Sequence, residues 1–261
     1  MQSLVLYNAP QSTCSQRVRF TLHEKNLAFS ELKLDLFSGD QLRPEYLKIN
    51  PNGVVPSLVH DGRVIIDSAV IIEYLSEVFP EPTPLVPHDA VARAAMRSLI
   101  RYIDEVPTPA VRVPSYNIAF LPHYRDMPEA DFVALAESKP LRKEFLLSMG
   151  RTGFSEEEMN KALERLRRAI VRMSETLRHS GGPWLMGTDL TLADIAMMPV
   201  LVRMADLGLG TLWEHLPEID QLLDALGARP AFSKTYYFGS LLTEKYPDLK
   251  NSLGRKDRAS V

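Results

Sequence analysis

The chain has 261 residues and is 45% hydrophobic, which is enough apolar material for one large domain or two modest ones. Its formal net charge is −3 and its basic residues are dispersed, so it has no electrostatic footprint for nucleic acid. Because no apolar run approaches the roughly 18 residues of a membrane span, and residues 1–8 turn polar too early for a signal peptide, we expect a cytoplasmic protein that binds neither nucleic acid nor membrane.

The cysteine and histidine content bears on disulfides and metals. Cys14 is the only cysteine, which excludes an intrachain disulfide and a cysteine-cluster metal site. The six histidines are scattered, and none forms an H-x-x-x-H pair. We therefore expect no metal site.

Residues 1–80 are predicted to form an α/β domain. Extended apolar patterns predict strands at 4–7, 29–36, 55–59 and 64–66, and helical spacing predicts helices at 18–24 and 69–78. With a further helix between the second and third strands, the order β-α-β-α-β-β-α is typical of a thioredoxin-like domain. The turn His60-Asp61-Gly62-Arg63 would join the last two strands as a hairpin.

A proline-rich segment follows this domain. Four prolines fall within Phe79–Pro87, where they remove backbone donors and interrupt helices, so we place a linker at 81–89. Residues 90–261 are predicted to form an all-helical domain, with helices at 90–111, 155–179, 191–207 and 217–226. Within it, Thr191-Leu-Ala-Asp194 has the spacing of an N-terminal capping box.

Two parts of the second domain lack a clear helical pattern. Residues 114–154, which are rich in proline and aromatic residues, are expected to be the least regular segment. The polar tail at 250–261 is expected to be loosely held.

Hydroxyl residues lie where the first strand ends and the first helix begins, at Ser12, Thr13 and Ser15. A hydroxyl there can donate a hydrogen bond to a sulfur, and the unpaired N–H groups of a helix start carry roughly half a positive charge. Both favour a thiolate over a thiol. An isolated serine at such a position is more often only a helix cap, so this segment alone leaves both interpretations open.

Two further segments carry groups that suit a small peptide. A cis bond at Val55-Pro56 would turn the Val55 backbone outward to pair with an extended peptide, although a trans proline is commoner. In Asp67-Ser68, which precedes a predicted helix, the acid can bind an ammonium, while Ser68 and the helix start bind a carboxylate. The alternative is again a helix cap. Together the three segments suit a peptide that carries a thiol and a γ-glutamyl group.

These motifs resemble those of the glutathione S-transferase family. Residues 12–19, Ser-Thr-Cys-Ser-x-Arg-Val-Arg, closely resemble the Ser-Ser-Cys-Ser-x-Arg-Val-Arg signature of its zeta class, and other family motifs resemble Asn50-Pro-Asn-Gly-x-Val-Pro56, Asp67-Ser68 and Thr191-x-x-Asp194. The resemblance extends from Leu4 to about Arg229. It implies a thioredoxin-like α/β N-terminal domain, an all-α C-terminal domain and a dimer of identical or related subunits.

The resemblance also implies roles for single residues. Ser12 would activate the thiol, Val55 with Pro56 would pair with the cysteinyl unit, and Asp67 with Ser68 would anchor the γ-glutamyl group. Thr13 and Gln41 would complete the glutathione site, with Gln41 at the glycyl end.

A second resemblance, to the bacterial β-etherases, leaves the activating hydroxyl open. The extra length around 116–154, and Gly150-Arg-Thr-Gly-Phe154 before a long charged helix, are similar to these enzymes, which cleave lignin-derived β-aryl ethers with glutathione. The first helix aligns with that of the β-etherases without gaps. In this alignment Ser15, rather than Ser12, matches the hydroxyl near the sulfur.

Cys14 and a group of aromatic residues have two interpretations each. In the omega-type pattern the nucleophilic cysteine would stand at position 12, so we expect Cys14 to be a small buried residue on the inner face of the helix rather than a thiol reductase nucleophile. The aromatic residues are either core or the wall of an apolar pocket for the second substrate: Tyr116, Phe120, Tyr124 and Phe154.

The function that the resemblances imply is attack of glutathione thiolate on an electrophilic carbon. Glutathione would be the co-substrate, a hydrophobic aromatic electrophile the second substrate, and no metal would take part. The electrophile would be a lignin-derived β-aryl ether if the chain is β-etherase-like. The alternatives are a zeta-like glutathione-dependent isomerase and a non-catalytic glutathione-binding subunit.

Overall fold

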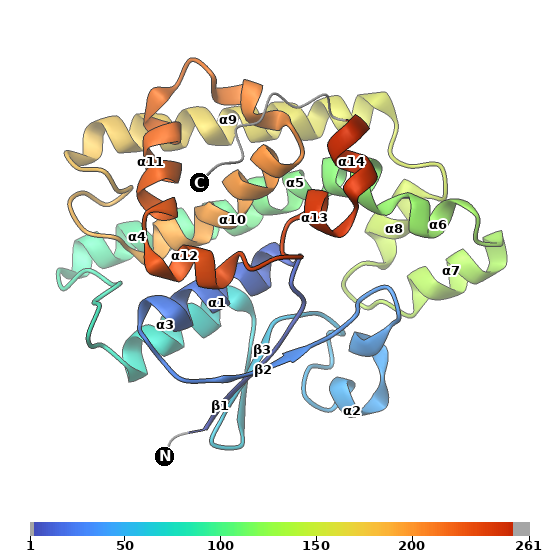
Figure 1. Ribbon diagram of the computed structural model, residues 1–261, viewed down its shortest axis with the longest axis horizontal. Helices are drawn as coiled ribbons and strands as arrows, with labels where there is room; N and C mark the ends of the chain where they lie inside the picture. The colour runs from blue at the N-terminus through green and yellow to red at the C-terminus, as the bar shows by residue number, and fades with distance from the viewer. Residues whose placement is uncertain (1–2, 253–261) are drawn as a thin grey trace.

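The computed structural model describes residues 3–252 and begins with a mixed four-stranded sheet (Figure 1). Its strands are β1 (Leu4–Asn8), β2 (Ser30–Lys33), β3 (Ser57–His60) and β4 (Arg63–Ile66). The strand order is β2-β1-β3-β4, with β2 parallel to β1 and β3 antiparallel to both of its neighbours. The predicted thioredoxin-like class is confirmed, and so is the hairpin, because β3 ends at His60 and β4 begins at Arg63.

The strand register brings three loops to one edge of the sheet. Ser57 at the start of β3 pairs with Tyr7 near the end of β1 and with Ile66 at the end of β4. The segment after β1, the turn before β3 and the start of the helix after β4 therefore meet at this edge. These are the segments that carry Ser12, Val55 and Asp67.

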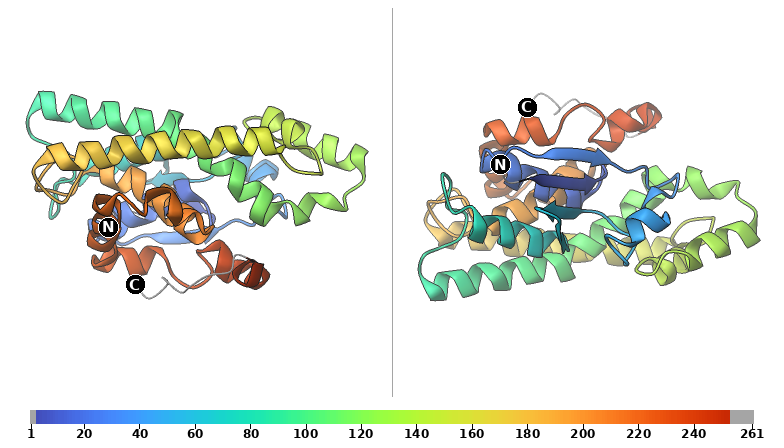
Figure 2. Two further views of the ribbon diagram at one scale, coloured as in Figure 1. Left: turned by 90° about the horizontal axis from the view of Figure 1, so that it is seen from above. Right: turned by 90° about the horizontal axis from the view of Figure 1, so that it is seen from below.

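The other regular elements of the described chain are helices (Figures 1 and 2). The first half adds α1 (Thr13–Glu24), the 3-10 turn η1 (Asp40–Leu42), α2 (Pro44–Leu47) and α3 (Ser68–Val78). The next helices are α4 (Ala90–Glu105), α5 (Pro107–Ser115), α6 (Pro122–Arg125), α7 (Glu129–Glu137), α8 (Lys143–Met149) and α9 (Glu156–Ser180). They are followed by α10 (Leu192–Asp206), the 3-10 turn η3 (Leu209–Trp213), α11 (Pro217–Gly227), α12 (Pro230–Thr235), α13 (Leu242–Lys245) and α14 (Pro247–Ser252).

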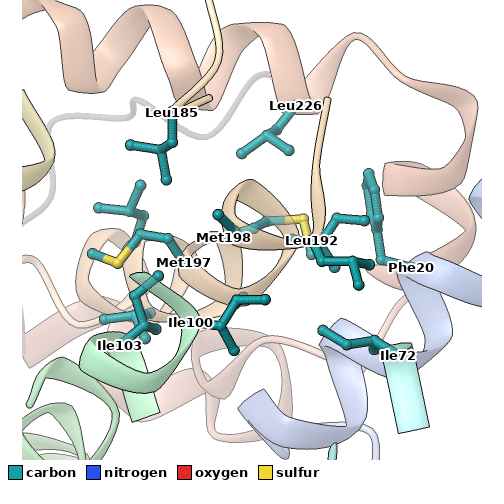
Figure 3. Close-up of a cluster of buried hydrophobic side chains, with 14 of the residues drawn as sticks. Phe20, Ile72, Ile100, Ile103, Leu185, Leu192, Met197, Met198 and Leu226 are labelled. Atoms are coloured by element: carbon teal, nitrogen blue, oxygen red, sulfur yellow. The ribbon is translucent and has the colours of Figure 1, made fainter. Parts of the chain in front are cut away.

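One hydrophobic core joins the two halves of the chain. Helix α1 packs against α3 on one side and against α10 and α12 on the other. Figure 3 shows Phe20 of α1 and Ile72 of α3 in the same cluster as Leu192 and Met198 of α10, all of them fully buried. Burial of this apolar surface fixes the position of α1 relative to the helical half.

The predicted capping box at the start of α10 is confirmed. The backbone N–H and the hydroxyl of Thr191 both donate to Oδ2 of Asp194 at 2.9 Å, and the N–H of Leu185 donates to Oδ1 at 2.7 Å. Burial outweighs these hydrogen bonds and raises the pKa of Asp194 to about 6. The box thus fixes the start of a helix whose residues are nearly all buried.

Two expectations about helices are wrong. The single helix predicted for 90–111 is two helices, α4 and α5, because Pro107 has no N–H to donate and disfavours helical backbone at Val106. The segment expected to be least regular holds the π-helical turn η2 (Tyr116–Phe120) and α6, α7 and α8. Prolines at 122 and 128 stand at or just before helix starts, where they are tolerated, so they divide the segment without abolishing helices.

The helices α6, α7 and α8 lie together at one end of the molecule (Figures 1 and 2). They surround a small separate cluster of buried side chains that includes Phe132, Leu146 and Met149. This segment therefore has a core of its own beside the main one.

The remaining predictions concern the linker, the tail and the membrane. No helix or strand lies between α3 and α4, and the division into 1–80, 81–89 and 90–261 stays a prediction. Most of the tail at 250–261 lies outside the described residues, beyond Ser252. Within residues 3–252, none of the helices has the length and apolar character needed to cross a membrane.

Candidate active site

A cavity of about 400 Å³ opens where the edge of the sheet faces the helical half. Its first wall consists of residues 9–14, 33–37, 40–41 and 52–55. Its second wall consists of residues 108, 111–112, 115–116, 120, 124, 139 and 141–142, with residues 203 and 245 between the walls. The cavity thus joins the two halves of the chain.

The hydroxyl residues at the start of α1 divide between the cavity and the core. Ser12 is the N-cap of α1, is half-buried and lines the cavity, and its Oγ accepts a hydrogen bond from the N–H of Ser15 at 3.3 Å. Thr13 lines the cavity as well. Ser15 is fully buried away from the cavity, where its Oγ accepts from the N–H of Ala9 at 3.3 Å. Of the two candidate activating hydroxyls, Ser12 alone faces the cavity.

The expectation for Cys14 is wrong in its orientation. The thiol residue is half-buried and lines the cavity, instead of lying on the inner face of α1. The inner face is formed by Ser15, Val18 and Leu22, at the spacing of one helix stripe. Cys14 lies one position before Ser15, which turns it about 100° from that residue and leaves it at the edge of the stripe.

The turn before β3 is held so that Val55 faces the cavity. The side chain of Asn50 donates to the carbonyl of Val54 at 2.9 Å, and the hydroxyl of Tyr46 donates to the same carbonyl at 2.7 Å. Among the described residues, nothing pairs with the backbone N–H and C=O of Val55. The Val55–Pro56 bond is cis, which is the form expected to turn the Val55 backbone outward. Tyr46 is a residue that the sequence did not single out, since its role depends on the folded turn.

Gln41 lies in η1 at one end of the cavity. It is buried, with 4% of its surface exposed, and its Nε2 donates to the carbonyl of Leu36 at 3.1 Å. Its Oε1 is buried without a partner among the described residues. A buried acceptor without a donor is costly, so the cavity offers an unfilled hydrogen-bond site there.

Asp67 and Ser68 stand at the start of α3, directly after the Ser57–Ile66 pair of the sheet, but they are not on the cavity surface itself. Asp67 is exposed, and its Oδ1 accepts from the N–H of Ala69 at 2.9 Å and of Val70 at 3.2 Å. It therefore caps α3, which is the alternative interpretation of the pair. Its backbone has a φ of 71°, which is unusual for a residue with a side chain. Ser68 is buried.

Three of the four aromatic residues line the second wall. Tyr116, Phe120 and Tyr124 face the cavity, and Phe37 of the first wall meets Phe120 with ring centroids 5.2 Å apart. Phe154 is not among the lining residues. It packs on Phe145 with centroids 4.9 Å apart.

The backbone of Phe154 ties the end of the 116–154 segment to η2. Its N–H donates to Oδ1 of Asn117 at 2.8 Å, and its carbonyl accepts from Nδ2 of the same residue at 3.0 Å. Phe154 thus supports the wall from behind and does not form it.

The basic residues of the cavity were not expected from the sequence. Arg112 on α5, with Lys139 and Arg142 between α7 and α8, lines the second wall, and all three are half-buried. Arg203 of α10 donates to the hydroxyl of Ser115 at 3.2 Å and to the carbonyl of Gln11, so it links the two walls. The sequence held one signal: Arg112 lies four residues after Thr108 and three before Ser115, on a helix face that is otherwise uncharged.

Comparison with known proteins identifies the family. Residues 6–83 match the glutathione S-transferase N-terminal domain and residues 131–230 match the glutathione S-transferase C-terminal domain. The chain is 32% identical to glutathione S-transferase 1 of Dianthus caryophyllus over 86% of its own length and 87% of that protein. It is 27% identical to a probable maleylacetoacetate isomerase of Caenorhabditis elegans over 88% of this chain and 92% of that one.

A solved structure is similar throughout. The chain is 30% identical to protein LigF of a Sphingobium strain, with 90% of this chain and 93% of that protein covered. The crystal structure of beta-etherase LigF from this source matches with a TM-score of 0.81 over 90% of this chain and 98% of that one. With its fold, its cavity and these matches, the chain belongs to the glutathione S-transferase family.

Proposed function

We propose that this chain is an enzyme in which glutathione thiolate attacks an electrophilic carbon of an aromatic substrate. One observation carries the proposal: Ser12 and the unpaired Val55 backbone lie on one wall of a single cavity, opposite the aromatic wall of Tyr116 and Phe120. Each wall suits one of the two reactants, and the cavity would hold them side by side.

The glutathione site in this proposal uses the first wall. The Val55 backbone pairs with the cysteinyl unit beside Pro56, and Gln41, whose Oε1 lacks a donor, accepts a hydrogen bond from the N–H of the glycyl unit. Asp67 binds the γ-glutamyl ammonium through Oδ2, since Oδ1 caps α3, and Ser68 with the helix start binds the carboxylate. Thr13 completes the site beside Ser12.

The chemistry follows from the position of Ser12. Its hydroxyl donates to the sulfur, and together with the start of α1 it stabilises the thiolate. The sulfur then forms a bond to the electrophilic carbon, and the leaving group departs with the electrons of the bond that breaks. Only stabilisation that favours the charged sulfur over the thiol accelerates this step.

For the electrophile, we propose an aryl ether of the kind that a β-etherase cleaves. The likeness to LigF over nearly the whole of both chains supports this choice, as does the aromatic wall. The thiolate would displace an aryloxide from the carbon next to a ketone. The leaving aryloxide accepts the proton that the thiol gave up.

A second candidate is a zeta-like isomerase, in which glutathione adds to a conjugated double bond, permits rotation and leaves unchanged. The residues of the 12–19 motif and the likeness to a probable maleylacetoacetate isomerase favour it. For either candidate we propose a cytoplasmic dimer with an identical or related subunit, as is common in the family.

One experiment separates these functions. The protein is incubated with glutathione and a panel of aryl ethers, dienoic acids and halogenated arenes, and the products are identified by mass spectrometry. A glutathione thioether with release of a phenol supports the β-etherase proposal. Isomerisation without consumption of glutathione supports the second candidate, and no product in any reaction would indicate a non-catalytic glutathione-binding subunit.

A further inference from the structure

Three basic side chains gather on the second wall of the cavity. Arg112 comes from α5, whereas Lys139 and Arg142 come from the connection between α7 and α8. They therefore reach one cavity from two separate parts of the chain. Beside them lie the rings of Tyr116 and Phe120.

None of the three forms an ion pair with a carboxylate of residues 3–252. Arg142 donates to the carbonyl of Leu141 at 2.9 Å, and Arg112 lies over the ring of Phe145, 5.5 Å from its centre. Lys139 has no hydrogen bond from its amine within the described chain. The second wall therefore holds three positive charges with no carboxylate partner among the described residues.

Neighbouring basic residues, in contrast, have acidic partners. Lys143 of α8 lies 3.4 Å from Glu137, and Arg151 lies 2.6 Å from Glu129, both away from the cavity. On the first wall, Lys33 lies 3.8 Å from Glu31. Acidic partners are thus available in this part of the protein, but they are absent where the three cations meet.

Like charges that are half-buried together repel one another. Burial, followed by the charge of Arg142, lowers the pKa of Arg112 to about 10, and the same two causes lower the pKa of Lys139. Arg112 stays charged at neutral pH. An anion bound among the three cations would relieve this repulsion.

The acidic residues of the cavity are on the opposite wall and already engaged. Asp35 accepts from the N–H of Phe37 at 2.9 Å, and Asp40 lies 2.8 Å from Arg43. They do not neutralise the second wall. The charge of the cavity therefore differs between its walls.

We propose that the second substrate carries a carboxylate, which Arg112, Lys139 and Arg142 bind while its apolar body lies against Tyr116 and Phe120. The part of this inference that concerns the reaction rests on the proposed function. The part that concerns binding of the anion does not. The γ-glutamyl carboxylate of glutathione is assigned to the start of α3 and its glycyl end to Gln41 on the other wall, so the cluster is free for the electrophile. A carboxylate there would orient the reacting carbon toward Ser12.

Binding is tested with unreactive probes. Benzoate, phenylacetate and cinnamate, each compared with its amide, are titrated by calorimetry into the full chain saturated with S-methylglutathione. We expect the wild-type protein to bind at least one carboxylate roughly tenfold or more tightly than its amide. Arg112→Gln and Arg142→Gln should each remove most of that preference, because each loses a charge-assisted hydrogen bond.

Arg125→Gln and Lys143→Gln are the matched controls. Arg125 is exposed, Lys143 lies away from the cavity, and neither change should alter the preference. Equal affinity for carboxylates and amides, or binding of neither, would overturn the inference. A loss of S-methylglutathione affinity in the Arg112 and Arg142 variants, with the carboxylate preference intact, would assign the cluster to the peptide and overturn it as well.

The reaction is tested with a reactive pair, 4-(chloromethyl)benzoate and 4-(chloromethyl)benzamide. The glutathione sulfur bonds to the benzylic carbon, and chloride leaves with the electrons of the C–Cl bond. We expect Arg112→Gln to raise KM for the benzoate roughly tenfold while kcat and the values for the amide change little. If wild-type protein prefers the carboxylate probes but converts neither chloride, the inference stands and the proposed function fails.

Discussion

The two walls of the cavity differ in how they are built. The first wall presents backbone groups and short polar side chains on tight loops, and each loop is held by local contacts such as those of Asn50 and Tyr46. The second wall presents long cationic side chains and rings from α5 to α8. A wall of backbone groups suits a reactant that is the same for every member of the family. A wall of side chains suits a reactant that differs from one relative to the next. The first wall can therefore be read from short motifs, and the second wall cannot.

The largest effect should come from the first wall. Replacement of Ser12 by Ala removes the donor to the sulfur, and loss of one such donor typically lowers the rate by about 10²–10³-fold. Steady-state kinetics with the best electrophile of the panel measure it. Ser15→Ala should have a much smaller effect on kcat, since Ser15 lies behind the wall. Equal losses of kcat in the Ser12 and Ser15 variants would contradict the assignment of the activating role to Ser12 alone.

A second prediction concerns the helix that joins the walls. α10 carries Arg203, and its start is fixed by Asp194. Asp194→Ala leaves the buried donors of Leu185 and Thr191 without an acceptor and should lower the free energy of unfolding by about 3 kcal/mol. Urea unfolding measures it, with Glu158→Ala of the exposed capping box of α9 as the control. A larger loss in the Glu158 variant would contradict the role of α10.

Asp194 should also make the free energy of unfolding depend on pH. The pKa of Asp194 is about 6 in the folded protein and 3.8 ordinarily, so the folded state holds the proton between these values. The part of the stability that comes from binding this proton is therefore present at low pH and lost as pH rises through 6. The difference in unfolding free energy between wild type and Asp194→Asn should be about 2 kcal/mol larger at pH 4.5 than at pH 7.5. Urea unfolding at both pH values measures it, and a difference that grows with pH would contradict burial as the dominant cause.

A smaller effect is expected at Asp67, which caps α3 and is also proposed to bind glutathione. Asp67→Asn keeps the cap and removes the charge, and it should weaken glutathione binding roughly tenfold with little change in stability. Asp67→Ala should weaken binding as much and also lose the cap. Asp89→Ala, which removes a cap of α4 away from the cavity, is the control. Unchanged glutathione affinity by calorimetry in both Asp67 variants would leave Asp67 as a helix cap only.

Much of the first half could be predicted from the sequence because its signals are local. The hairpin at Asp61-Gly62 depends on a few adjacent residues, and so does the capping box of Asp194 in the helical half. The position of Ser12 on the cavity follows from its place at the start of a helix.

The second wall depends on contacts distant in the sequence. Phe154 looks like a pocket residue, but Asn117, 37 residues earlier, holds its backbone and turns it into support. Arg112 and Arg142 become neighbours only when the chain folds around the cavity, and no pattern within either segment indicates this. Cys14 was expected on the inner face of α1 because cysteine is generally buried. That preference does not tell which face of the helix packs against the rest of the protein.

The central claim is that the first wall activates glutathione through Ser12 while the second wall holds the electrophile. The most direct measurement is a pH titration of the ultraviolet absorbance of bound glutathione thiolate in the wild type, Ser12→Ala and Ser15→Ala. We predict that the thiol pKa rises by roughly one unit or more in the Ser12 variant and stays near the wild-type value in the Ser15 variant. A larger rise in the Ser15 variant, or no rise in either, would contradict the account.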